Sequence, residues 1–162
     1  MLRFFSFFRF HSGVPVLLAA YITHTDCQKH EMGNHHPECP ERLGAVNDQL
    51  LIKGLLDYMT QHDAPLATGA QLARAHSPSY LEEFAEIAQR VPEGAHVQID
   101  PDTSINEFSY QAALRAAGAA VLAADLVATG QAPVAFCNIR PPGHHAERSN
   151  AVLICHALSG DH

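Results

Sequence analysis

The chain has 162 residues, of which 47% are hydrophobic, so we expect one soluble domain with a buried core and no second domain. The formal net charge is -7 and the acidic residues are spread along the chain, which excludes the clustered basic surface that nucleic acid requires. Twelve histidines accompany only ten lysine and arginine residues, which favours metal binding or chemistry near neutral pH.

Residues 1–13 are interpreted as an N-terminal extension before the domain. The apolar sequence MLRFFSFFRFHSGVPVLLAA is interrupted by Arg9, His11 and Pro15, so it does not reach the roughly 18 residues of a membrane span. We therefore expect no contact with a membrane and no export. Four cysteines without regular spacing do not form the pattern of a disulfide framework, which favours a reducing, cytoplasmic compartment.

Short apolar runs alternate with helical patterns along the rest of the chain. The run VPVLLAAYI predicts a strand buried on both faces, and VAFCNI predicts another strand. Apolar spacing and start or stop residues predict three helices, whereas the acidic stretch IDPDTSINEFS is expected to be a loop. The expected strands cover 14–22 and 134–139, and the expected helices cover about 40–54, 77–90 and 110–129.

This alternation predicts an α/β fold in which helices flank a parallel sheet. The sequence RPPGHHA, residues 140–146, follows the predicted strand 134–139 directly. Ligands bind at the carboxyl ends of strands in such sheets, and two prolines stiffen a loop by restricting φ. The sequence therefore predicts a functional loop at this position.

His144 and His145 are the candidate catalytic pair in this loop. Neighbouring rings do not converge easily on one metal, so the two histidines suit two separate tasks. One can act as a general base toward a metal-bound water, and the other can donate a hydrogen bond or stabilise charge. The alternative is an ordinary solvated pair.

A second cluster of potential ligands follows the first predicted strand. Cys27 and His30 form a C-x-x-H pair, and His36 and Cys39 form an H-x-x-C pair. Two such pairs could close a tetrahedral structural zinc site. However, no glycine or hairpin signal frames them as a zinc knuckle, so a solvated loop is the competing interpretation.

Asp100 and Asp102, in the sequence DPDT, are a candidate carboxylate pair at the edge of a site. Loop aspartates also cap helices or form Asx turns, and that alternative stays open.

Four stretches of the chain together carry a family resemblance: HPECPERL at 36–43, DPDT at 100–103, the helix sequence QAALRAAGAA, and AFCNIRPPGHHAE at 135–147. They resemble the zinc-dependent histone deacetylase superfamily, in its class II-like and bacterial branch with the acetylpolyamine amidohydrolases. RPPGHHA is the most specific part, and the resemblance supports a deacetylase-like domain over residues 14–148.

The resemblance implies a three-layer, arginase-like fold and hydrolysis of an acetylated lysine side chain or an acetylated polyamine, with zinc binding the acetyl oxygen and a water. It implies that His145 is the general base and His144 its electrostatic partner. It also implies that Asp100 or Asp102 binds the substrate backbone, with Gly143 beside them in the substrate site.

The stretch after Arg148, SNAVLICHALSGDH at 149–162, departs from the family pattern. Family members continue into a strand with Asp-x-Asp-x-His-His, which supplies two metal ligands, and then into a later aspartate ligand and a tyrosine. None of these occurs here at the family positions. We therefore expect a truncated member with an incomplete sheet, no catalytic metal of its own, no activity alone, and an exposed sheet edge through which it could form an oligomer.

Overall fold

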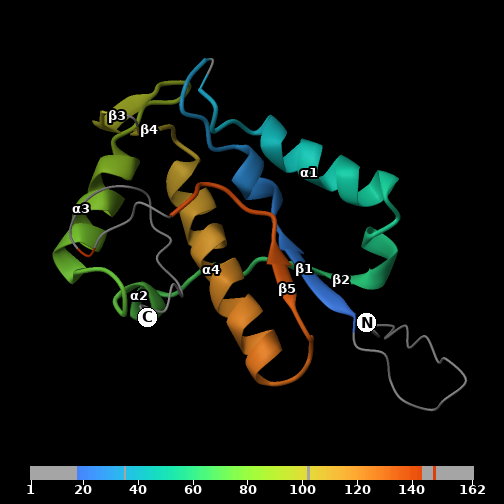
Figure 1. The fold of residues 1–162 in the computed structure, drawn as a ribbon. Helices are drawn as coiled ribbons and strands as arrows, with labels where there is room; N and C mark the ends of the chain where they lie inside the picture. The colour runs from blue at the N-terminus through green and yellow to red at the C-terminus, as the bar shows by residue number, and fades with distance from the viewer. Residues whose placement is uncertain (1–17, 35, 102, 144–147, 149–162) are drawn as a thin grey trace, which may run out of the picture.

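A computed structural model describes residues 18–34, 36–101, 103–143 and 148. Its centre is a parallel sheet of three strands in the order β2-β1-β5 (Figure 1). In β1, Ala20 and Ile22 are fully buried and Tyr21 is 3% exposed, which confirms a strand buried on both faces. The strands are β1 (Ala19–Thr23), β2 (Met59–Asp63) and β5 (Ala135–Cys137).

Strand β2 was not predicted from the sequence. Its sequence MTQHD is polar and its side chains are exposed or half-buried, because β2 lies at the edge of the sheet. A strand with no buried apolar face gives neither an apolar run nor an apolar alternation, which are the patterns that identify strands in a sequence.

The three predicted helices are confirmed to within one or two residues. Ser77 begins the second of them, because its side chain accepts a hydrogen bond from the backbone N–H of Tyr80. These helices are α1 (Glu41–Ile52), α3 (Pro78–Gln89) and α4 (Ser109–Ala128). Three shorter helices were not predicted: η1 (Thr25–Gln28), η2 (Leu56–Tyr58) and α2 (Gly69–Leu72).

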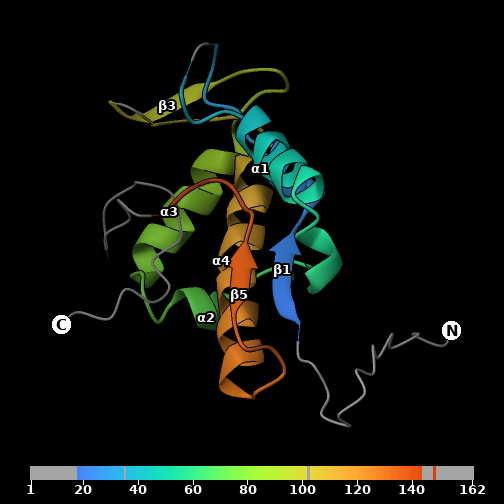
Figure 2. The same ribbon diagram turned by 45° about the vertical axis from the view of Figure 1, so that its right-hand side comes forward.

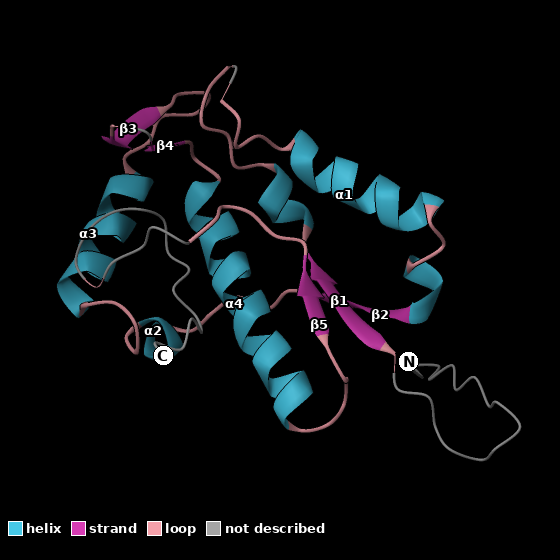
Figure 3. Cartoon of the chain, in the orientation of Figure 1, coloured by secondary structure: helices cyan, strands magenta, loops and turns pink. Residues whose placement is uncertain are grey.

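The prediction of a loop over the acidic stretch was wrong in part. Strands β3 (Val97–Asp100) and β4 (Thr103–Ile105) pair antiparallel there, in a hairpin that lies apart from the parallel sheet (Figure 3). Ile105 is fully buried, and Val97 and Ile99 pack against the same core cluster. The aspartates and the proline suggested a loop, whereas burial of alternate apolar side chains stabilises two short strands.

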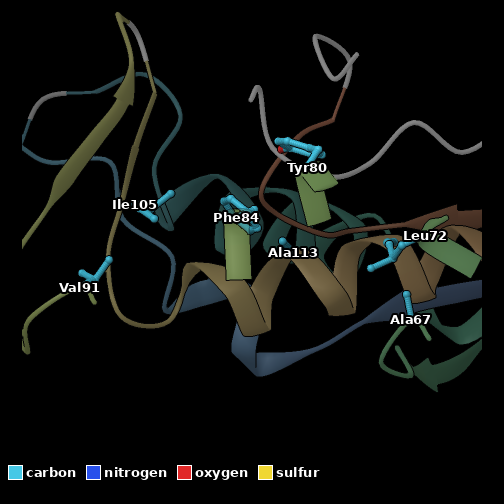
Figure 4. Close-up of a cluster of buried hydrophobic side chains, with 8 residues drawn as sticks. Ala67, Leu72, Tyr80, Phe84, Val91, Ile105 and Ala113 are labelled. Atoms are coloured by element: carbon cyan, nitrogen blue, oxygen red, sulfur yellow. The ribbon is translucent and has the colours of Figure 1, made fainter. Parts of the chain in front are cut away.

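Helix α4 lies between the sheet and α3 (Figures 1 and 2). On its sheet side, Ala119 packs with Ala20 and Ile22 of β1. On its other side, Ala113 packs with Phe84 of α3, as the close-up shows (Figure 4). The layered α/β arrangement with a parallel sheet and flanking helices is therefore confirmed.

Helix α1 packs on the opposite side of β1. Side chains alternate along a strand, so Tyr21 points away from the face that Ala20 and Ile22 present to α4. The Tyr21 hydroxyl donates to Oδ1 of Asn47 in α1 at 3.4 Å. The sheet thus has helices on both faces.

Small residues let α4 approach the segment that follows β2. A Cβ added to Gly118 would lie 1.9 Å from the carbonyl oxygen of Pro65. The backbone N–H of Ala67 donates to the carbonyl of Leu114 at 3.0 Å, so the two backbones are in direct contact. Within the described part of the chain, α4 is the one helix long and apolar enough to cross a membrane, but it is packed in the core between the sheet and α3.

Candidate functional site

The loops that follow β1 and β5 lie side by side at the carboxyl edge of the sheet. Asn138 joins the chain after β5 to the end of β1: its backbone N–H donates to the carbonyl of Ile22 at 2.9 Å, and its own carbonyl accepts from the Thr23 hydroxyl at 2.8 Å. The Asn138 side chain donates to the Tyr21 hydroxyl and to the carbonyl of Leu43, at 2.8 and 3.1 Å. The predicted functional loop therefore starts at the carboxyl end of a parallel strand.

Arg140, the first residue of RPPGHHA, is buried and paired with a carboxylate. Its side chain is 1% exposed, and Glu38 accepts two hydrogen bonds from it, from Nε at 2.6 Å and from Nη2 at 2.5 Å. Its remaining N–H groups donate to the carbonyls of Cys27, His30 and Glu38. A bidentate arginine–carboxylate pair is strong and directional, so it ties this loop to the loop after β1.

His30 lies beside this ion pair and is fully buried. Its Nδ1 is 2.7 Å from the hydroxyl of Ser109, the first residue of α4, and its Nε2 is 3.7 Å from Oε2 of Glu38, beyond hydrogen-bond distance. Burial, reinforced by the positive charge of Arg140, lowers the pKa of His30 to about 4. The imidazole is therefore neutral at pH 7.

The catalytic pair itself lies outside the described residues. The described part of the loop ends at Gly143, which is buried like Pro141 before it. The roles expected for His144 and His145 therefore stay predictions. Beyond them, the carbonyl of Arg148 accepts from the backbone N–H of Ser77 at the start of α3, at 2.8 Å.

Asp100 is the last residue of β3, where it pairs with Thr103 in the hairpin, and Asp102 lies outside the described residues. Within the described chain, no hydrogen bond or ion pair joins Asp100 to residues 138–143. These interactions thus do not link Asp100 to the loop, and a substrate-binding role for either aspartate stays a prediction.

The four residues proposed as a structural zinc site are not assembled as ligands. Among the residues that the structure describes, no three histidine, cysteine, aspartate or glutamate side chains are grouped so that they could hold a metal ion. Burial raises the pKa of the Cys27 thiol, which opposes the thiolate that a metal requires. In the second pair, Nδ1 of His36 accepts from the backbone N–H of Glu38 at 3.1 Å. Within the described residues, these four side chains therefore do not form an assembled metal site.

Sequence reasoning overlooked the residues that hold these loops together, namely Glu38, Ser109, Asn138 and Arg140. A signal for Arg140 was present, because it is the first charged residue after Asp125 and follows the predicted strand 134–139 directly. A charged residue at the end of a buried strand requires a partner, and Glu38 lies within the other specific motif, HPECPERL.

Known proteins resemble the chain over most of its length. A family model described as a histone deacetylase domain matches residues 36–155. A histone deacetylase-like amidohydrolase of Pseudomonas aeruginosa is 32% identical over 120 residues, which are 74% of this chain and 30% of that protein. The polyamine deacetylase HDAC10 of Mus musculus is 34% identical over 126 residues, covering 73% of this chain and 18% of that protein.

The fold agrees with this similarity. The crystal structure of the HDA15 HD domain superposes with a TM-score of 0.74 at 27% sequence identity, over 83% of this chain and 39% of that chain. The chain thus spans less than half the length of these relatives. The residues that the family model matches include both specific motifs, HPECPERL at 36–43 and RPPGHHA at 140–146. The chain therefore belongs to the histone deacetylase family.

Proposed function

We propose that this chain carries the general-base loop of a hydrolase that removes acetyl groups from an acetylated lysine side chain or an acetylated polyamine. The supporting observation is the position of residues 140–143, which begin the histidine motif at the carboxyl ends of β1 and β5. His145 removes a proton from the attacking water, and His144 stabilises the charge that develops. Gly143, with Asp100 or Asp102, contacts the substrate.

We further propose that these 162 residues do not catalyse the reaction alone. The family's Asp-x-Asp-x-His-His stretch does not occur in the sequence, and the described residues contain no group that could hold a metal. A catalytic zinc requires three protein ligands that converge on it. The family chemistry therefore requires metal ligands that the described residues do not supply.

An activity assay tests the proposal of inactivity. The purified chain, supplied with zinc and an acetyl-lysine peptide or N-acetylputrescine, is expected to release no acetate. Turnover by the natural chain that disappears in a His145→Ala variant would contradict the proposed inactivity. The same result would support His145 as the general base. Sequencing the gene beyond the codon for His162 in all three frames would show whether the ligand strand is encoded there.

Substrate binding tests the proposed substrate class independently of turnover. We expect N-acetylputrescine or an acetyl-lysine peptide at millimolar concentration to shift the Gly143 amide in a heteronuclear NMR spectrum. The deacetylated amines are the matched controls and should shift it less. Equal shifts with both forms, or none with either, would contradict recognition of the acetyl group by this loop.

A structural zinc site at Cys27, His30, His36 and Cys39 is the second candidate function, and it would make the chain a metal-binding module. Its support is that Cys27 and His30 are both fully buried on the same loop. His36 and Cys39 would have to move to complete a tetrahedral site. One zinc per chain that is lost in a Cys27→Ala/Cys39→Ala variant would establish it, whereas metal-free protein after refolding with zinc would exclude it.

We propose that the protein is located in the cytoplasm. Cys27, Cys39 and Cys137 are free thiols in the described part of the chain, which suits a reducing compartment. Cell fractionation with a C-terminal tag checks this, and recovery in a secreted or membrane fraction would contradict it.

A further inference from the structure

We propose that Arg140 and Glu38 are positioning residues, which set the direction in which the chain leaves β5 toward His144 and His145. This inference rests on the proposed function, because it assigns the pair a purpose in holding the general-base loop. It goes beyond that function, because it concerns residues that contact neither the substrate nor the attacking water.

The guanidinium group of Arg140 has no donor left for a substrate. A guanidinium carries five N–H donors. In Arg140 the Nε donates to Oε1 of Glu38, the Nη1 donates to the carbonyls of Cys27 and His30, and the Nη2 donates to Oε2 and the carbonyl of Glu38. Because every donor has an acceptor within the protein, Arg140 cannot bind an anionic group of the substrate and acts only on the loops.

These bonds join two loops that are far apart in the sequence. Arg140 and Glu38 are separated by 102 positions, and the pair connects the start of the loop after β5 with the loop after β1. Two parallel bonds between planar groups restrict rotation as well as distance. The backbone of Arg140 is therefore held in orientation, and the next residues, Pro141 and Pro142, restrict φ and transmit that orientation along the loop.

A neutral histidine connects the pair to a rigid helix. The backbone carbonyl of His30 accepts a hydrogen bond from Nη1 of Arg140 at 2.9 Å, and the His30 ring contacts the Ser109 hydroxyl at the start of α4 at 2.7 Å. The Ser109 hydroxyl also accepts from the backbone N–H of Asn106, at 2.9 Å. The ion pair is thus fixed to α4, the helix at the centre of the core.

Stability alone does not explain a buried ion pair at this place. Desolvation of two charges offsets most of their attraction, and apolar side chains of similar volume often give equal or greater stability. Residues 126–139, which lead into Arg140, contain no charged residue. The buried charge of Arg140 after this segment is therefore better explained by the direction that it gives to the loop than by a net gain in stability.

Hydrogen exchange at the loop, compared with the core, tests the inference in the full chain. In Arg140→Lys the charge remains but the bidentate geometry is lost, and in Glu38→Gln the shape remains but the charge is lost. We expect both variants to speed exchange by about tenfold or more at loop amides, with core amides unchanged. The Gly143 amide shift, which reports loop conformation, should also move. The loop amides are Asn138, Arg140 and Gly143, and the core amides are Ala20, Ile22 and Ala116.

Arg42→Gln is the matched control, because Arg42 is an exposed second partner of Glu38, with Nη1 at 3.1 Å from Oε1. It should leave loop exchange unchanged. Equal acceleration in loop and core would show that the pair only stabilises the fold, and no acceleration would show that it does not hold the loop. Both results overturn the inference, as would failure of both variants to fold. None of these measurements requires turnover. The deacetylase assay therefore does not affect the conclusion from hydrogen exchange, and the exchange result does not affect the conclusion from the assay.

Discussion

Burial, together with a neighbouring positive charge, decides the charge of one of the twelve histidines. His30 has no exposed surface and lies beside the guanidinium of Arg140, and both effects disfavour its protonation. A buried neutral imidazole makes stability depend on pH, because the unfolded chain exposes the same side chain to water.

The expected dependence follows from the pKa values. The pKa of His30 is lowered from 6.5 to about 4 in the folded state, so between these values the unfolded chain binds more protons than the folded chain. The contribution of neutral His30 to the free energy of unfolding is fully present above pH 6.5. It is lost as the pH falls toward 4, and the whole loss is roughly 3 kcal/mol at most. Urea unfolding at pH 7 and pH 5 should show a steeper loss for the natural chain than for His30→Gln. Parallel losses would contradict this assignment.

Among the secondary-structure elements, α4 depends most on the size of its side chains. It contacts the sheet on one side and α3 on the other, and its buried surface consists mainly of alanine. The chain after β2 crosses this helix at Gly118, where the backbones touch. A methyl group at this position has no space.

We therefore expect Gly118→Ala to destabilise the protein. The added Cβ would overlap the Pro65 carbonyl, which requires backbone displacement and costs about 1–3 kcal/mol or more. Gly44→Ala is the matched control, because Gly44 lies inside α1 and a methyl group added there would have no atom within 4 Å, so it should add about 0.5–1 kcal/mol of stability. Thermal or urea unfolding measures both. Equal effects of the same sign would refute the proposed close contact.

The two edges of the parallel sheet differ in chemistry. At one edge, β2 presents polar and charged side chains, which discourage pairing with another strand. At the other edge, β5 belongs to an uncharged segment in which Val134 and Phe136 are 56% and 42% exposed. Within the described chain no strand pairs with the outer side of β5.

The prediction of an oligomer through the exposed sheet edge therefore applies to β5. We expect the chain to associate at increasing concentration, and we expect Val134→Lys to reduce association by placing a charge directly before this strand. Val127→Lys, at an exposed site near the end of α4, is the control for the added charge itself. Light scattering after size-exclusion chromatography measures the mass. A monomer at all concentrations, or equal effects of the two lysines, would contradict association through β5.

Local patterns in the sequence determined the three long helices, the strands β1 and β5, and the position of RPPGHHA at a strand end, because apolar periodicity and turn residues act over a few neighbouring positions. Strand β2 and the β3–β4 hairpin escaped prediction, because β2 is polar and the hairpin is stabilised by the burial of Ile105 in a core assembled from distant segments.

Only the tertiary structure decided how the candidate site is held. The sequence shows Glu38 and Arg140 within two motifs, but their pairing depends on parallel strands that bring positions 102 residues apart into contact. The same packing buries His30 and separates the potential zinc ligands into different environments, which spacing along the chain cannot reveal. The type of each residue can be read from the sequence, whereas its burial and its hydrogen-bond and ion-pair partners depend on how the whole chain packs.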